Sequence, residues 1–258
     1  MRATRLTIVL MLAFVAISNA ELYVVAHFPY GGGWGTRLLL TNGSADPVAV
    51  ELDYFTQRGQ PTSVPLAGPE LTGTKQLLIG PNQVGTVATD PAKQNASDLQ
   101  VTWAVARSNG PLNIFTLFDY APTSVPSTIP SSQVVSAVGA AATPAGQSFR
   151  FPVFVNGATR FNAGMALANP NSVSAAISVA LLDKDGLTRA TRVIPLPANG
   201  QISFVLTDNI AFGGSLGSSE LFTGTVGVCA SVPIGLVALG VEGSVLFTVS
   251  VSTDYRCN

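Results

Sequence analysis

The serine at the centre of residues 213–217 is the first candidate for chemistry. Gly213-Gly214-Ser215-Leu216-Gly217 has G-x-S-x-G spacing, which in hydrolases places a nucleophilic serine on a sharp turn, with a histidine as its base. The single histidine of the chain, His27, would have to be brought beside Ser215 by the fold. Residues 218–220 begin no convincing helix. A flexible Gly/Ser loop is therefore the favoured interpretation, and a hydrolase stays a remote alternative.

A glycine-rich segment at residues 31–35 offers a second site. Phosphate-binding loops precede a helix whose N-terminus holds the anion, whereas residues 37–41 have the pattern of a strand. Of two aromatic residues here, Tyr30 directly precedes this segment and Trp34 lies within it. Exposed, they would form a stacking platform for a sugar ring; alternatively, they cover the open end of a sandwich. Carbohydrate binding through Tyr30 and Trp34 is thus a speculative alternative function.

Metal and acid–base sites find little support. Asp183-Lys184-Asp185-Gly186 resembles the start of a calcium loop, but residues 187–190 add no carboxylate, and calcium needs six to eight oxygens. Several acids, among them Asp46 and Asp208, lie at predicted turns, where aspartate is common anyway. We expect no metal and no cofactor, and we expect the protein not to be an enzyme.

The chain contains two cysteines, Cys229 and Cys257. An even count in an oxidising compartment favours a disulfide. We hypothesise that this bond ties the C-terminal tail to a strand. Two free thiols, or a bond from Cys257 to another chain, are the alternatives.

Composition indicates which elements would have to position these residues. In 258 residues, 47% are hydrophobic and only 10% are charged, against roughly 25% charged in typical soluble domains. Disorder is therefore excluded, and the net charge of −1 argues against a nucleic-acid partner. With 25 glycines and 17 prolines, the chain favours strands and turns over helices.

The first twenty residues have the layout of a secretory signal peptide. Arg2 and Arg5 precede an apolar run from Leu6 to Ile17, and Ser18-Asn19-Ala20 supplies small residues for cleavage. We therefore expect export to the periplasm or the extracellular space. The apolar run is shorter than the about 20 residues that span a bilayer, and we expect no membrane span in the mature chain.

The remaining sequence contains one unit written twice. Phe28-Pro29 and Phe151-Pro152 each begin a segment that runs to an asparagine, Asn42 or Asn169. The alternating strand-like runs that follow superpose, with Val50, Leu52 and Tyr54 on Ile177, Val179 and Leu181. Further correspondences place Gly59 on Gly186, Gln83-Val84 on Gln201-Ile202, residues 102–105 on 225–228, Ala106 on Cys229, and Pro111-Leu112 on Pro233-Ile234.

These observations predict an all-β protein: two tandem antiparallel β-sandwich, immunoglobulin-like domains after a signal peptide. The boundaries are 1–20 for the signal peptide, 21–121 for the first domain, 122–147 for a Pro/Ser/Ala-rich linker and 148–258 for the second domain. Part of the linker, residues 133–138, could pair as an edge strand. The only helix expected is a short one near 207–212.

Residues 28–118 and, less closely, 151–251 resemble a group of uncharacterised secreted bacterial proteins with one or two such units. The resemblance rests on Phe28-Pro29, on the run from Gly31 to Asn42, on Pro81-Asn82-Gln83 and on Gly110-Pro111-Leu112. It implies secretion and the sandwich fold, and it brings no reaction and no ligand.

We therefore predict a secreted, non-catalytic protein with a structural, adhesive or surface-interaction role. Its partner would be a polysaccharide or another surface protein. The alternating run 245–251 would also allow self-association if it lies at a sheet edge.

Overall fold

The computed structural model describes residues 21–67, 75–94, 98–121, 136–212, 215–216, 221–242 and 245–257. The predicted signal peptide lies outside this range. The described chain is nearly all antiparallel β-structure, as the composition predicts, with one short helix, α1 (Pro91–Gln94). No helix in the described ranges is long and apolar enough to cross a membrane.

The N-terminal half, Glu21 to Pro144, consists of two sheets. One has the order β10-β1-β7-β3-β4, with β5 also paired to β3, and the other has the order β6-β2-β8-β9. Their strands are β1 (Glu21–Tyr30), β2 (Trp34–Thr41), β3 (Val48–Thr56), β4 (Pro61–Thr62), β5 (Lys75–Ile79), β6 (Val84–Ala88), β7 (Gln100–Ser108), β8 (Asn113–Tyr120), β9 (Ser136–Ala141) and β10 (Thr143–Pro144).

The C-terminal half, Gly146 to Cys257, is one sheet in the order β14-β13-β16-β11-β12-β15, with β17 on β16. Its strands are β11 (Gly146–Asn156), β12 (Phe161–Ala168), β13 (Ala175–Asp183), β14 (Thr188–Leu196), β15 (Gln201–Val205), β16 (Leu221–Glu242) and β17 (Val245–Thr248). The first part of β16 pairs with β11 and β13, and its last part pairs with β12 and β17. Both parts contribute to one core, so the sheet closes on itself like a sandwich.

The pairing order is the same in both halves. The row β1-β7-β3-β5 corresponds to β11-β16-β13-β14, and β6-β2-β8-β9 corresponds to β15-β12-β16-β17. The long β16 thus corresponds to two separate strands of the N-terminal half, β7 and β8.

Two buried asparagines, Asn42 and Asn169, hold equivalent turns with equivalent hydrogen bonds. Each side-chain amide donates to three backbone carbonyls and each side-chain oxygen accepts a nearby backbone N–H. The acceptors are Asp46, Ile79 and Gly80 for Asn42 (2.8–3.1 Å), and Val173, Leu196 and Pro197 for Asn169 (2.8–3.4 Å). Both asparagines are fully buried, and their place in the sequence repeat is matched in space.

The strand register corrects part of the repeat alignment by one residue. Tyr54 pairs with Ala104, and its counterpart Leu181 pairs with Val226. Ala104 therefore corresponds to Val226, so residues 102–105 do not match 225–228, and the counterpart of Cys229 is Arg107 rather than Ala106. Because side chains alternate between faces, a slip of one residue would move the core side of the strand outward.

The turn before β6 shows the same slip. Asn82 and Asn199 have φ values of 55° and 53°, and Val84 and Gln201 occupy matching ladder positions opposite Thr41 and Ala168. Val84, rather than Gln83, is thus the counterpart of Gln201. By contrast, the correspondence of Gly59 with Gly186 holds, with φ values of 80° and 79°.

The prediction of a helix near residues 207–212 is wrong. The structure has successive turns there, in which the Asp208 carboxylate accepts the N–H of Val205 at 3.0 Å. Phe212 is fully buried. Asp208 therefore closes a turn after β15 instead of capping a helix.

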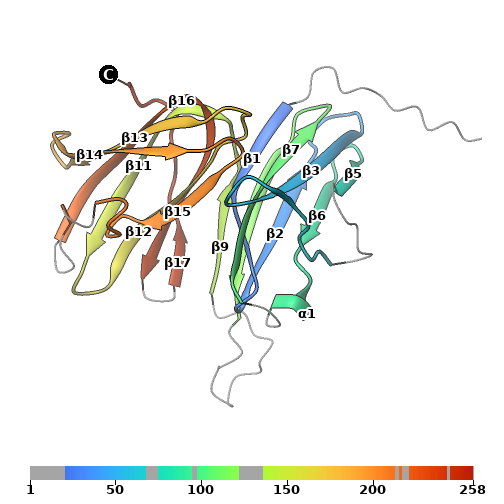
Figure 1. The fold of residues 1–258 in the computed structure, drawn as a ribbon. Coiled ribbons are helices and arrows are strands. Elements are labelled where there is room, and N and C mark those ends of the chain that lie inside the picture. Colours follow the sequence, from blue (N-terminus) through green and yellow to red (C-terminus); the bar gives the residue numbers. More distant parts are fainter. Residues whose placement is uncertain are drawn as a thin grey trace, which may run out of the picture.

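A third core cluster joins the two halves, which lie side by side in Figure 1. It combines Val24 and Trp103 of the N-terminal half with Ala166 and Val237 of the C-terminal half. Within the interval predicted as a linker, residues 136–141 form β9, which pairs with β8. Strand β9 also approaches β17, where the Thr248 hydroxyl donates to the carbonyl of Gly139. The side of β17 that could pair with another chain is thus occupied by β9.

The Tyr54 hydroxyl is buried and has no hydrogen-bond partner among the described residues. Burial also raises the pKa of this phenol above its ordinary range. An uncompensated buried hydroxyl costs about 1–3 kcal/mol. We therefore expect Tyr54→Phe to raise the free energy of unfolding in urea by about 1 kcal/mol.

Tyr23→Phe is the matched control for this prediction. The Tyr23 hydroxyl accepts the N–H of Leu112 at 2.9 Å and donates to Glu21, so its removal should destabilise by about 1 kcal/mol. Destabilisation by both substitutions alike would contradict the proposed difference between the two hydroxyls.

Candidate functional site

A cavity of about 350 Å³ lies at the junction of the two halves. Its lining is mainly apolar and comes from β1, β2, β8 and β7 with the preceding Leu99 on one side, and from β12, β16, β17 and β15 with the turn at Asp208 on the other. The lining residues are His27, Pro29, Trp34, Leu99, Val101, Phe118, Gly164, Met165, Ala166, Ser203, Phe204, Val205, Asp208, Val237, Leu239, Val241 and Leu246. Neither half could form this cavity alone.

His27 faces the cavity because β1 is irregular at this point. The β1–β7 register shifts between Val25 and Phe28, and a bulge of this kind can re-aim a side chain out of the strict alternation. The His27 ring lies 5.7 Å from that of Phe118, and its Nδ1 is 3.5 Å from the Gln201 side-chain nitrogen. Simple alternation along the sequence gives no sign of this bulge.

The surroundings of His27 keep its imidazole neutral. Desolvation by the apolar walls lowers the pKa of His27 from 6.5 to about 4. Among the described lining residues, the other ionisable group is Asp208, which is exposed to solvent. At neutral pH the described interior of the cavity therefore contains one uncharged imidazole.

This lowered pKa predicts acid sensitivity. The folded state holds His27 neutral, whereas the unfolded chain takes up a proton on His27 below pH 6.5. The free energy of unfolding is therefore highest above pH 6.5 and falls as the pH drops from 6.5 toward 4. The loss is about 1.4 kcal/mol per pH unit, so we expect the free energy of unfolding to fall by about 2 kcal/mol between pH 6.5 and 5.

Urea unfolding at several pH values would measure this slope. His27→Gln should flatten it, since His27 is the only histidine of the chain. An equal slope in the wild type and in the variant would assign the acid sensitivity to carboxylates instead.

The structure separates the two aromatic residues proposed as a sugar platform. Tyr30 packs against the core cluster of the N-terminal half, and burial raises the pKa of its phenol. Trp34 instead packs against the junction cluster and lines the cavity. Its ring neighbour is Tyr120, at 4.9 Å between ring centroids. Trp34 is thus the member of the pair that a ligand in the cavity would touch.

The glycine-rich segment itself is a tight turn that leads into a strand. Gly31, Gly32 and Gly33 all have positive φ, and β2 begins directly at Trp34. The turn is held by α1, whose Gln94 carbonyl accepts the N–H of Gly33 at 2.9 Å. The segment therefore lacks the following helix on which a phosphate-binding loop depends.

The other sequence motifs lie away from this cavity. Ser215 is not among the residues that line the cavity with His27, and Leu216 beside it is buried in the core. Gly213, Gly214 and Gly217 lie outside the described residues. The Asp183 carboxylate accepts the N–H groups of Asp185 and Leu187 at 3.0 and 2.9 Å, which closes the hairpin. Within the described part of the chain, no three His, Cys, Asp or Glu side chains gather as metal ligands.

Trp103 and Gln201 connect the halves beside the cavity. The Trp103 indole donates to the carbonyl of Asn199 at 3.1 Å, and its ring stacks on Phe55 at 4.7 Å. The backbone N–H of Gln201 donates to the carbonyl of Gln57 at 2.9 Å, and its side chain donates to that of Ala26 at 3.2 Å. These contacts fix the relative position of the two cavity walls.

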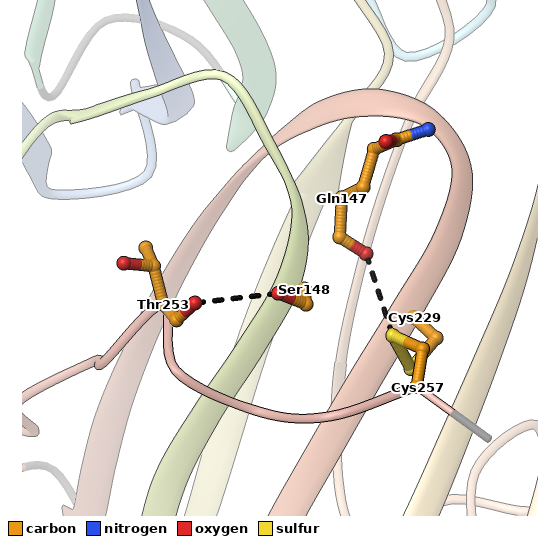
Figure 2. The surroundings of a disulfide bond; sticks show 5 residues. All are labelled: Gln147, Ser148, Cys229, Thr253 and Cys257. Carbon is orange, nitrogen blue, oxygen red and sulfur yellow. Dashed lines mark hydrogen bonds between the residues drawn. A yellow bond between two sulfur atoms is a disulfide. The ribbon is translucent and has the colours of Figure 1, made fainter.

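A disulfide joins Cys229 of β16 to Cys257, the pair expected from the sequence (Figure 2). It holds the C-terminal tail beside β11, where Ser252 and Arg150 exchange two backbone hydrogen bonds of 2.8 Å. The tail covers Gly227, at which a β-carbon would overlap the Tyr255 ring. Gly227 corresponds to Val105, which packs in the junction cluster of the N-terminal half. The C-terminal tail thus covers one face of β16. The corresponding face of β7, in the N-terminal half, packs at the junction instead.

Comparison with known proteins gives no relative from which a function could be transferred. No protein-family model matches the chain, and no curated protein matches it. The class of the protein therefore follows from fold and site alone: a nearly all-β, sandwich-like chain of two like halves with an apolar cavity between them.

Proposed function

We propose that this chain is an exported, non-catalytic protein that acts by binding. The observation that carries the proposal is the chemistry of the cavity. Among the described lining residues, the one inward-facing ionisable group is that of His27, and its polar contact is the neutral amide of Gln201. A general base needs a matched pKa and a positioned proton donor or nucleophile, and His27, with a pKa of about 4, has a glutamine instead.

Export is supported by two independent features. Residues 1–20 have the layout of a signal peptide, and a disulfide suits an oxidising compartment. We infer that the mature chain begins at Glu21 and forms two tandem, immunoglobulin-like units, as in the secreted bacterial proteins that it resembles. Its role would be structural, adhesive or surface-interacting.

One experiment tests export and another tests the absence of catalysis. N-terminal sequencing of the exported protein should start at Glu21; retention of residues 1–20 would contradict export with cleavage. On ester, amide and glycoside substrates we expect no turnover that depends on His27. Hydrolysis by the wild type that His27→Gln abolishes would overturn the non-catalytic proposal.

Carbohydrate binding is the second candidate, because Trp34 lines the cavity and has Tyr120 beside it. Sugar rings stack on aromatic faces of this kind. Retention on insoluble polysaccharides tests it, with Trp34→Ala as the variant. Phe154→Ala is the control, because Phe154 is an exposed aromatic residue that packs on Phe161 outside the cavity. Equal retention of both variants would exclude Trp34 as the sugar site.

A further inference from the structure

The junction cavity has the size and the walls of a small-molecule site. Such sites are concave, mostly apolar, about 300–1,000 Å³ in volume and common where two domains meet. This one has about 350 Å³ between two like halves. Its walls include aromatic, aliphatic and thioether side chains, contributed by Trp34, Met165 and Leu239 among others.

The walls are also held in place before any ligand binds. Trp103 and Gln201 fix the two halves beside the cavity with hydrogen bonds of 2.9–3.2 Å. At Gly235, next to the junction, an added β-carbon would overlap Val24 of the opposite half. Because the halves approach this closely, the space would not collapse by a small movement of one half against the other.

The charge of the lining limits what can bind. Among the described residues that line the cavity there is no lysine or arginine, so an anionic group would lose its hydration without gaining a counter-ion. The carboxylate of Asp208, exposed in the lining, would add repulsion. The imidazole of His27 and the hydroxyl of Ser203 are neutral groups that could form hydrogen bonds with one or two polar atoms of a ligand.

We propose that the junction cavity binds an uncharged, largely apolar small molecule with an aromatic or alicyclic body. The inference rests on the proposed binding function and names its ligand class. The ligand replaces water against Trp34, Phe118 and Leu239, and its neutral polar atom faces His27 or Ser203.

Two dyes with the same aromatic body test the ligand class. N-phenyl-1-naphthylamine is uncharged, and 8-anilinonaphthalene-1-sulfonate adds one sulfonate. We expect saturable fluorescence enhancement of the neutral dye by the full mature chain, and binding of the anionic dye at least about tenfold weaker because its sulfonate lacks a counter-ion. No saturable binding of the neutral dye, or equal binding of both dyes, would overturn the proposal.

A glycine substitution tests the location. At Gly164, which lines the cavity, an added β-carbon meets its nearest neighbours at 3.4–3.9 Å, an ordinary contact distance. Gly164→Leu should therefore fold while filling part of the cavity, and weaken binding of the neutral dye at least about tenfold, as expected for steric blockage of a preformed pocket. Gly43→Leu is the matched control, because a β-carbon at Gly43 has nothing within 4 Å and Gly43 does not line the cavity.

Trp34 supplies a second readout that does not depend on Gly164→Leu folding. Because Trp34 lines the cavity, bound neutral dye should quench its fluorescence by energy transfer from the indole to the dye. Trp34→Phe should reduce this energy transfer while the dye still binds. Unchanged affinity in Gly164→Leu, or unchanged transfer in Trp34→Phe, would place the dye elsewhere and overturn the assignment. Loss of dye binding would leave the non-catalytic proposal standing, whereas only turnover dependent on His27 would remove that proposal.

Discussion

Trp103→Ala is expected to lower the free energy of unfolding by about 3–5 kcal/mol, the range for truncating a buried aromatic residue. Trp103 is fully buried between the halves, stacks on Phe55 and donates to the carbonyl of Asn199. Its removal leaves a void in the cluster that joins the halves and an unpaired carbonyl beside it. We expect the wild type to unfold in urea in a single transition, because the halves share a core cluster, and the variant to unfold in two, one for each half.

Two controls accompany this prediction. Trp103→Phe keeps most of the packing and loses the hydrogen bond, so the expected loss is about 1–2 kcal/mol. Trp34→Ala truncates the other tryptophan, which is only partly buried, and should cost less than Trp103→Ala. A Trp103→Ala protein with an unchanged single transition would show that the halves do not depend on this contact.

Removal of the disulfide is expected to cost about 3–4 kcal/mol, since the bond closes a loop across a sequence separation of 28 residues. The Cys229→Ser, Cys257→Ser double variant avoids a free thiol and should match the reduced wild type in urea unfolding. Val249 and Val251, which pack against the C-terminal core, should then become accessible to proteases together with the tail.

The mass of the intact protein provides the check on this prediction. Reduction of the bonded monomer should add two hydrogens, and alkylation should then modify two thiols. A native chain with two thiols open to alkylation before reduction would contradict the bond. A double variant with wild-type stability would show that Ser252, Arg150 and Tyr255 hold the tail unaided.

Local sequence patterns were sufficient for strands such as β3 and for the hairpin turns, although not for the short helix α1 or for the turns at residues 207–212. The alternation at Val50, Leu52 and Tyr54 predicts a strand with one buried face, and these residues are buried in β3. Gly59 and Gly186 have the left-handed φ that their hairpins need. Alternation and turn geometry depend on near neighbours in the chain, which is why they can be recognised in the sequence.

Ladder register was harder to predict, because it depends on distant strands. The repeat alignment placed residues 102–105 one position out, since valine, alanine and threonine succeed one another there and similarity alone cannot decide between neighbouring positions. The pairing of β3 with β7 and of β13 with β16 decides it. The sequence likewise offered no reason to separate Tyr30 from Trp34, which belong to different clusters.

By itself, the sequence determined an all-β chain of two like halves with few reactive groups and a cysteine pair suited to a disulfide. Only the tertiary structure decided that the halves share a core, that β9 arises from the interval predicted as a linker, and that a cavity opens between them. The physical reason is that the local sequence around Val24 or Val237 does not indicate which other strand these outward-facing side chains will pack against. What they contact depends on how two sheets, far apart in the chain, come together.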